Sequence, residues 1–205
     1  MMPHHEDAGR APDGRLHPGP SHRRWVRLPR VRIRPAVPGD TPALLAIEEA
    51  ADGLFAGVGM AEVADAGPAD WPGELERHTA AGRAWVAAEA GDRPIAYLVL
   101  DLVDGCAHIA QVSVHPSHAH RGIGRSLIER AAAWATELDL PALTLTTFAD
   151  VPWNAPYYRR LGFRALPGAG IGPGLRDVIA REAAQGLDRW PRVAMIREIQ
   201  RSTGP

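Results

Sequence analysis

The sequence predicts a mixed α/β (α+β) fold, in which helices lie on both faces of a central, mostly antiparallel sheet. In the first half of the folded part, short strand patterns are joined by hairpin-turn signals, and in the second half strands and helices alternate. This order is typical of a mixed sheet that is covered by helices. With 205 residues the chain can build one domain with a substantial core, but not two full-sized ones.

The folded domain is expected to cover residues 31–205. Residues 1–30 combine clustered Pro, Gly, His and Arg with almost no apolar periodicity, which predicts a disordered leader. An alternating apolar pattern at 31–35 predicts the first strand of the domain.

Local signals place the other elements. Asp40 or Thr41 caps a first helix that has Pro42 in its first turn. Its apolar side is expected to comprise Leu44, Leu45, Ile47, Leu54 and Phe55. The later helices are expected at 71–81, 122–138, 154–160 and 175–185. The later strands are expected at 84–89, 94–103, 107–114, 142–148, 163–166 and 192–199. The apolar side of the 122–138 helix should contain Leu127, Ile128, Ala131, Ala135 and Leu138.

Composition limits the cellular setting and the partners. A formal net charge of −1 and the lack of a basic stripe argue against binding to nucleic acid or to an anionic membrane. The single cysteine, Cys106, cannot support an intrachain disulfide framework and indicates a reducing compartment. The sequence has neither an apolar run of about 20 residues nor the apolar core of a secretory signal. We therefore expect a cytoplasmic protein.

A glycine-containing turn precedes the 122–138 helix and predicts an anion site. The first N–H groups of a helix have no intrahelical partner, and the helix dipole puts partial positive charge there. Such a turn binds a phosphate through its backbone, and Gly122 and Gly124 allow a close approach. Arg121 and Arg125 flank it and can add charge-assisted bonds. The simpler alternative is a glycine-rich helix start that only packs on a sheet.

A second segment helps to interpret this turn. Residues 150–163 end in Tyr-Arg-Arg-Leu-Gly-Phe, at 158–163, and the turn itself reads Ala-His-Arg-Gly-Ile-Gly, at 119–124. Together they resemble the GNAT superfamily of N-acetyltransferases, which has a pyrophosphate loop of the form Q/R-x-x-G-x-G/A and a later A-x-x-x-Y-x-x-x-G-F-like helix end. Ala119 departs from the Gln or Arg of that loop, and Arg121 or His120 would supply the missing donor.

The resemblance implies a GNAT-like sheet that splays near its fourth and fifth strands, with acetyl-CoA as cosubstrate and no metal. It also implies acetyl transfer to a primary amine by direct attack on the thioester. The positions expected to contact the coenzyme are Gln111, Val112, Ser113, Val114, Ala119, His120, Arg121, Gly122, Ile123, Gly124, Arg125, Asn154 and Tyr158.

Three catalytic roles follow from the resemblance. The Val114 N–H would polarise the acyl carbonyl. Tyr158 matches the general acid that protonates the CoA sulfur, which a phenol with a pKa of about 10 can do at neutral pH. The base is open: His115 is preferred, and the alternatives are a water chain or one of Glu48, Glu49, Asp101 and His108.

The sequence leaves two alternatives open. His115, His118 and His120 have a spacing that could suit a metal, but their loop must present its backbone to phosphate, and a structural zinc takes four protein ligands. A non-catalytic CoA-binding sensor of the same fold is the alternative function. The acceptor would be a small-molecule or peptide amine, bound between the 50–80 region and a 167–190 insertion that covers the site mouth, and a homodimer is compatible with the sequence.

Overall fold

The structure is a computed structural model that describes residues 31–65 and 70–199. The leader expected at 1–30 therefore lies outside the described residues. Seven strands form one open sheet in the order β1-β2-β3-β4-β5-β7-β6. The strands are β1 (Arg32–Pro35), β2 (Ala84–Ala88), β3 (Pro94–Val103), β4 (Cys106–Val114), β5 (Ala142–Phe148), β6 (Arg164–Ala165) and β7 (Arg192–Glu198).

Every neighbouring pair is antiparallel except β4 and β5, which run parallel. This confirms the expected mixed, mostly antiparallel sheet. The α-helices are α1 (Thr41–Asp52), α2 (Trp71–Ala80), α3 (Ile123–Glu137), α4 (Ala155–Arg160) and α5 (Pro173–Ala184). Short 3-10 helices are η1 (Pro38–Asp40), η2 (Gly53–Val58), η3 (Ala61–Asp65), η4 (Pro116–His118), η5 (Gly168–Gly170) and η6 (Leu187–Arg189). Among the described residues, no helix combines the length and apolar character needed to cross a membrane.

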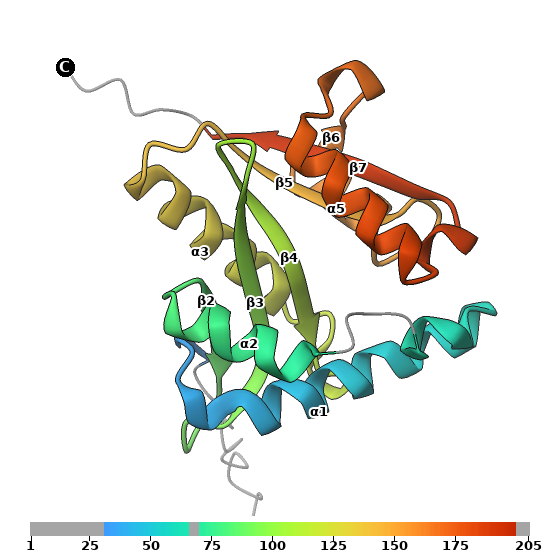
Figure 1. The fold of residues 1–205 in the computed structure, drawn as a ribbon. Helices are drawn as coiled ribbons and strands as arrows, with labels where there is room; N and C mark the ends of the chain where they lie inside the picture. Colours follow the sequence, from blue (N-terminus) through green and yellow to red (C-terminus); the bar gives the residue numbers. More distant parts are fainter. Residues whose placement is uncertain (1–30, 66–69, 200–205) are drawn as a thin grey trace, which may run out of the picture.

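The two faces of the sheet have separate cores. On one face, α1 and α2 bury Leu44, Ile47 and Leu75 against Tyr97 and its neighbours on β2 and β3. On the other face, α3 and α4 pack against a larger core. From α3 that core takes Leu127, Ile128, Ala131 and Ala135. Figure 1 shows α1 and α2 on the near side of β2 and β3, with α3 behind, so helices cover both faces as predicted.

The sheet splays between its two parallel strands. The β4–β5 ladder contains only the pairs Ala107–Leu143 and His108–Thr144, near the start of each strand. Beyond them the two strands diverge (Figure 1). A bulge marks the same place, because Val99 pairs with Gln111 while Leu100 pairs with Ile109, which leaves Ala110 without a partner on β3. A bulge adds twist and bends a strand, so the backbone of β4 turns away from β5.

Three local predictions were wrong in detail. Helix α1 ends at Asp52 and continues as η2, which has a different turn angle, so Leu54 is 43% exposed instead of lying on the apolar side. Leu138 follows the last residue of α3 and is 50% exposed. The strand expected at 163–166 contains only two residues, between Gly162 with φ of 87° and Pro167.

Candidate functional site

The glycine turn lies where β4 leads into α3. His120 and Gly122 have left-handed backbone conformations, with φ of 60° and 76°, and Gly122 is the N-cap of α3. No side chain caps the helix start, so its first N–H groups point outward without an intrahelical acceptor. The Arg121 guanidinium donates to the Ser117 carbonyl at 3.2 Å, which ties the turn to η4. The turn thus has the geometry of a backbone anion site.

Gly124 lies in the first turn of α3 and is closely covered. A Cβ at this position would lie 3.1 Å from the Tyr157 hydroxyl and 3.6 Å from Val114 Cγ2. The absence of a side chain at Gly124 therefore lets α4 and the end of β4 approach the helix start. Tyr157 is half-buried, and its hydroxyl lies at the turn.

The free edge of β4 faces the splayed gap. The His115 N–H donates to the Ile95 carbonyl at 3.0 Å across the β3–β4 pair. In an antiparallel ladder, alternate residues turn their N–H and C=O groups away from the partner strand. Val114 and Val112 therefore direct these groups away from β3, where β5 no longer pairs with β4. Ser113 and Gln111 point their side chains to the α1 face, and Gln111 Nε2 donates to Ser113 Oγ at 2.9 Å.

A carboxylate from α1 reaches this part of β4. Glu48 accepts hydrogen bonds from the Tyr97 hydroxyl at 2.8 Å and from Gln111 Nε2 at 3.1 Å. Burial raises the pKa of Glu48 to about 7, and the bond from Tyr97 opposes part of that rise. Asp52 lies one turn further along α1, and burial raises its pKa to about 6. Glu48 is thus a half-buried carboxylate that can exchange a proton near neutral pH.

Sequence reasoning had placed Glu48 only among several alternatives. The signal that could have selected it is its spacing, because Glu48 is four residues after Leu44 and next to Ile47, on the buried side of the helix. Glu49, its neighbour, is exposed. The structure therefore distinguishes the half-buried Glu48 from its exposed neighbour Glu49.

The other base candidates are engaged elsewhere. His108 is buried within the paired part of β4 and β5, where its Nδ1 lies 3.0 Å from Thr144 Oγ1. Burial lowers the pKa of His108 to about 4. Asp101 lies 3.0 Å from His78 Nε2 on α2, and that bond holds the pKa of Asp101 below its usual range. The His115 Nδ1 lies 2.7 Å from Ser117 Oγ and faces the η4 turn.

The histidines near the turn are held by polar partners. Ser117 Oγ also lies 2.9 Å from His118 Nδ1, and the opposite ring nitrogen of His118 lies 3.3 Å from Glu89. His120 is exposed. Within residues 31–65 and 70–199, no three His, Cys, Asp or Glu side chains are grouped as metal ligands. The expectation that the protein uses no metal stays a prediction.

Tyr158 lies within an aromatic cluster on α4. Its ring centroid is 5.6 Å from that of Tyr157 and 5.7 Å from that of Phe163, both in edge-to-face arrangements. Burial raises the pKa of Tyr158 well above its usual range, so the phenol keeps its proton at neutral pH. The Asn154 carbonyl accepts from the Tyr157 and Tyr158 N–H groups at 2.8 and 3.0 Å and so starts α4.

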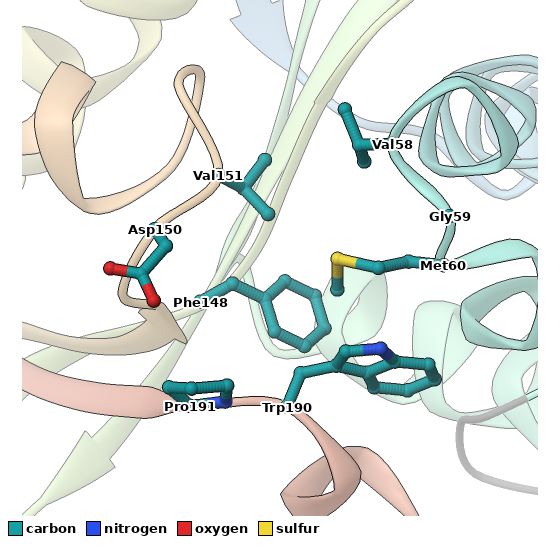
Figure 2. Close-up of a pocket in the computed structure, with 8 residues that line it drawn as sticks. All are labelled: Val58, Gly59, Met60, Phe148, Asp150, Val151, Trp190 and Pro191. Carbon is teal, nitrogen blue, oxygen red and sulfur yellow. The ribbon is translucent and has the colours of Figure 1, made fainter.

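Two cavities flank this region. One of about 620 Å³ lies beside the first turn of α3 and is lined in part by Arg121, Ile123 and Ser126. The other, of about 250 Å³, is drawn in Figure 2 and lies at the end of β5. Its walls take Met60 from the 50–80 region and Trp190 from the 167–190 insertion, the two segments that were expected to form an acceptor pocket.

Comparison with known proteins identifies a family that matches this part of the chain. The model of the acetyltransferase (GNAT) family matches residues 48–163. The match begins at Glu48 and ends at Phe163, so it includes the free edge of β4, the glycine turn and α4.

Solved structures have the same fold at low sequence identity. An N-acetylglutamate synthase from Neisseria gonorrhoeae, complexed with coenzyme A and N-acetyl-glutamate, is 17% identical with a TM-score of 0.62, over 85% of this chain and 36% of that one. A GNAT-family acetyltransferase from Staphylococcus aureus Mu50 is 13% identical with a TM-score of 0.63, over 83% and 100% of the two chains. The PaiA N-acetyltransferase from Thermoplasma acidophilum, in complex with coenzyme A, is 15% identical with a TM-score of 0.60, over 82% and 99%. The chain thus spans about a third of the gonococcal synthase and nearly all of the other two.

Proposed function

Because the chain belongs to the acetyltransferase (GNAT) family, we propose that it is an N-acetyltransferase that moves an acetyl group from acetyl-CoA to a primary amine. Family membership supports acetyl transfer in general, and the geometry of this chain supports the narrower proposal. The observation that carries it is the free edge of β4: Val112 and Val114 turn their N–H groups into the gap left by β5, directly before the glycine turn.

The chain has groups that suit the diphosphate and the pantetheine arm of acetyl-CoA. Uncapped N–H groups at the start of α3 fit a diphosphate, and the bare Cα of Gly122 leaves that approach open, since nothing lies within 4 Å of a Cβ built there. The β4 edge offers backbone donors and acceptors to the amide groups of an extended pantetheine arm, in the manner of an added strand. Gln111 to Val114 and Ala119 to Arg125 are therefore the residues proposed to hold the coenzyme, together with Asn154 and Tyr158.

Glu48 is proposed as the general base in place of His115. Its carboxylate lies on the α1 side of β4, is held by two hydrogen bonds, and has a pKa of about 7. A base with a pKa near the working pH combines a useful ionised fraction with adequate basicity. The His115 imidazole instead faces Ser117 in the η4 turn.

The proposed reaction forms a C–N bond to the amine and breaks the C–S bond of the thioester. The amine nitrogen attacks the thioester carbonyl, and Glu48 accepts the proton that the nitrogen loses, directly or through water. The Val114 N–H donates to the developing oxyanion. When the tetrahedral intermediate collapses, the C–S bond breaks and the Tyr158 hydroxyl supplies a proton to the leaving sulfur. The products are the N-acetylated amine and free CoA.

The test is release of free thiol from acetyl-CoA in the presence of a panel of amines, with Tyr158→Phe measured alongside. We expect turnover with at least one amine and a loss of roughly 100-fold or more in kcat for the variant. Tight CoA binding without turnover on any amine would instead support the sensor alternative. Failure to bind CoA at all would overturn both.

A further inference from the structure

Resting on this proposed function, we propose that the acceptor is a small primary amine that carries an aromatic ring, and that the ring binds in the cavity at the end of β5. Three segments far apart in the sequence form the cavity: residues 58–60 at the end of η2, residues 148–151 at the end of β5, and residues 190–191 before β7. Figure 2 shows Met60 and Trp190 beside the Phe148 ring, with Val58 and Val151 above it in this view.

The walls suit a flat apolar group. The cavity is lined by Val58, Gly59, Met60, Phe148, Asp150, Val151, Trp190 and Pro191, of which only Asp150 is charged. Aromatic rings favour edge-to-face and offset contacts with other rings, and the Met60 thioether adapts its shape to such a ligand. The volume of about 250 Å³ lies just below the roughly 300–1,000 Å³ of pockets that hold drug-sized ligands. The cavity therefore fits a single ring system.

The cavity is preorganised by the surrounding packing. The Phe148 ring lies 5.4 Å from Phe55 and 6.0 Å from Trp190, both edge-to-face, and Phe55 lies 5.7 Å from Trp153. The Arg192 guanidinium lies 4.8 Å from the Phe148 centroid and is paired with Glu182 at 2.8 Å, so its charge is balanced. A wall that is already ordered loses little entropy when a ligand binds.

The cavity stands in a defined relation to the proposed base. Glu48 and Asp52 are four residues apart and share one side of α1, and Phe55 follows in η2. Phe55 in turn contacts Phe148 at the cavity wall. Phe55 therefore connects the helix that carries Glu48 to the wall of the cavity.

The charges near Glu48 support an acceptor whose ring lies in the cavity and whose amino group points toward α1. The hydrogen-bond partners of Glu48 are the neutral groups of Tyr97 and Gln111. In the described part of the chain, neither Glu48 nor Asp52 has a Lys or Arg nitrogen within 4 Å. Two adjacent carboxylates without a cation favour an incoming ammonium group. The apolar cavity and the acidic end of α1 therefore complement the two ends of one arylalkylamine.

The experiment compares 2-phenylethylamine and tryptamine with hexylamine, spermidine and a short peptide that begins with Phe. We expect kcat/KM for the arylalkylamines to exceed that for each other acceptor by about tenfold or more, since an apolar pocket discriminates on this scale. Trp190→Ala and Val58→Trp, which enlarge and fill the cavity, should each raise KM for the arylalkylamines about tenfold while leaving CoA affinity unchanged. Leu102→Ala, an exposed position on β3 outside the cavity, is the control and should change neither.

The outcomes separate this inference from the function on which it rests. Turnover that is fastest with spermidine, hexylamine or the peptide would overturn the inference and leave the acetyltransferase proposal intact. Arylalkylamine turnover that neither cavity variant alters would also overturn it. If the protein binds no CoA, or turns over none of these amines, the proposed function fails first. Because Val58 is 43% exposed, Val58→Trp provides a test even if Trp190→Ala does not fold.

Discussion

The Tyr97 hydroxyl donates a hydrogen bond of 2.8 Å to the Glu48 carboxylate. Tyr97 lies fully buried in the central strand β3, and Glu48 comes from α1, so this bond fixes a titratable group against the sheet. Gln111 on β4 donates to the same carboxylate at 3.1 Å. The proposed base is thus held by β3 and β4, and β4 is the strand that borders the splayed gap.

Replacing Glu48 by Gln should lower kcat/KM by about 100-fold or more, because the amide cannot accept a proton. In the unaltered protein the base must be ionised. Since burial raises the pKa of Glu48 to about 7, kcat/KM should increase as the pH rises through that value. The pH profile of thiol release measures both effects.

Glu49→Gln is the matched control, because it makes the same chemical change at the neighbouring, exposed position. Its rate and pH profile should equal those of the unaltered protein. If the acidic limb near pH 7 persists in Glu48→Gln, another group is the base.

Tyr97→Phe should move the acidic limb of the pH profile to higher pH. The hydrogen bond from Tyr97 opposes the effect of burial on Glu48, so its loss raises the pKa of that carboxyl further. The same change should cost about 1.5–3 kcal/mol of unfolding free energy, the range for a hydrogen bond to a charged group. Denaturant unfolding and the pH dependence of kcat/KM check the two expectations. An unshifted limb would show that Tyr97 only packs.

Gly124→Ala should weaken CoA binding by about tenfold, because the new Cβ would lie 3.1 Å from the Tyr157 hydroxyl and must displace it. Combining the change with Tyr157→Phe removes that oxygen and leaves ordinary contacts, of 3.6 Å to Val114 and 3.9 Å to Tyr157 Cζ. Isothermal titration with CoA should therefore show recovery in the double variant. Equal losses in the single and double variants would mean that the Cβ blocks the coenzyme itself.

Asp104→Ala should destabilise the protein by about 0.5–2 kcal/mol, the usual cost of losing a helix cap. The Asp104 carboxylate, in the turn between β3 and β4, accepts from the Gly174 and Leu175 N–H groups at 2.8 and 2.9 Å at the start of α5. Thermal unfolding measures the effect. Asp139→Ala is the control, since Asp139 shares the left-handed φ of Asp104, at 54° against 50°, but caps no helix. Equal losses in both variants would assign the effect to backbone strain.

The contact between His78 and Asp101 should make stability depend on pH. The hydrogen bond to Asp101 raises the pKa of His78, so its contribution is complete below the unfolded pKa of about 6.5 and is lost as the pH rises through the folded pKa. The bond to His78 lowers the pKa of Asp101, whose contribution is present above the unfolded value of about 3.9 and is lost as the pH falls through the folded one.

Urea unfolding at about pH 5.5 and about pH 9 checks this, with the His78→Gln variant as reference. The difference in unfolding free energy between the two proteins should be larger at the lower pH. A difference that is independent of pH would mean that His78 contributes by packing alone.

The sequence by itself determined the elements whose signals are local. Strand β3 at Pro94–Val103 and strand β5 at Ala142–Phe148 have the expected bounds, because turn residues and Pro141 delimit their β-rich runs. The glycine turn before α3 was predictable for the same reason, since helix starts depend on neighbouring residues. The two motifs of that turn and of α4 also predicted the family that the comparison confirms.

Only the tertiary structure decided which groups meet. Glu48 became the proposed base because Tyr97 and Gln111, 49 and 63 residues away, converge on it and burial shifts its pKa. The aromatic cavity joins three segments between residues 58 and 191, and Asp104 caps a helix that starts about seventy residues later. Periodicity and turn chemistry act between neighbours in sequence, whereas desolvation and cavity shape depend on neighbours in space, so no local pattern contains them.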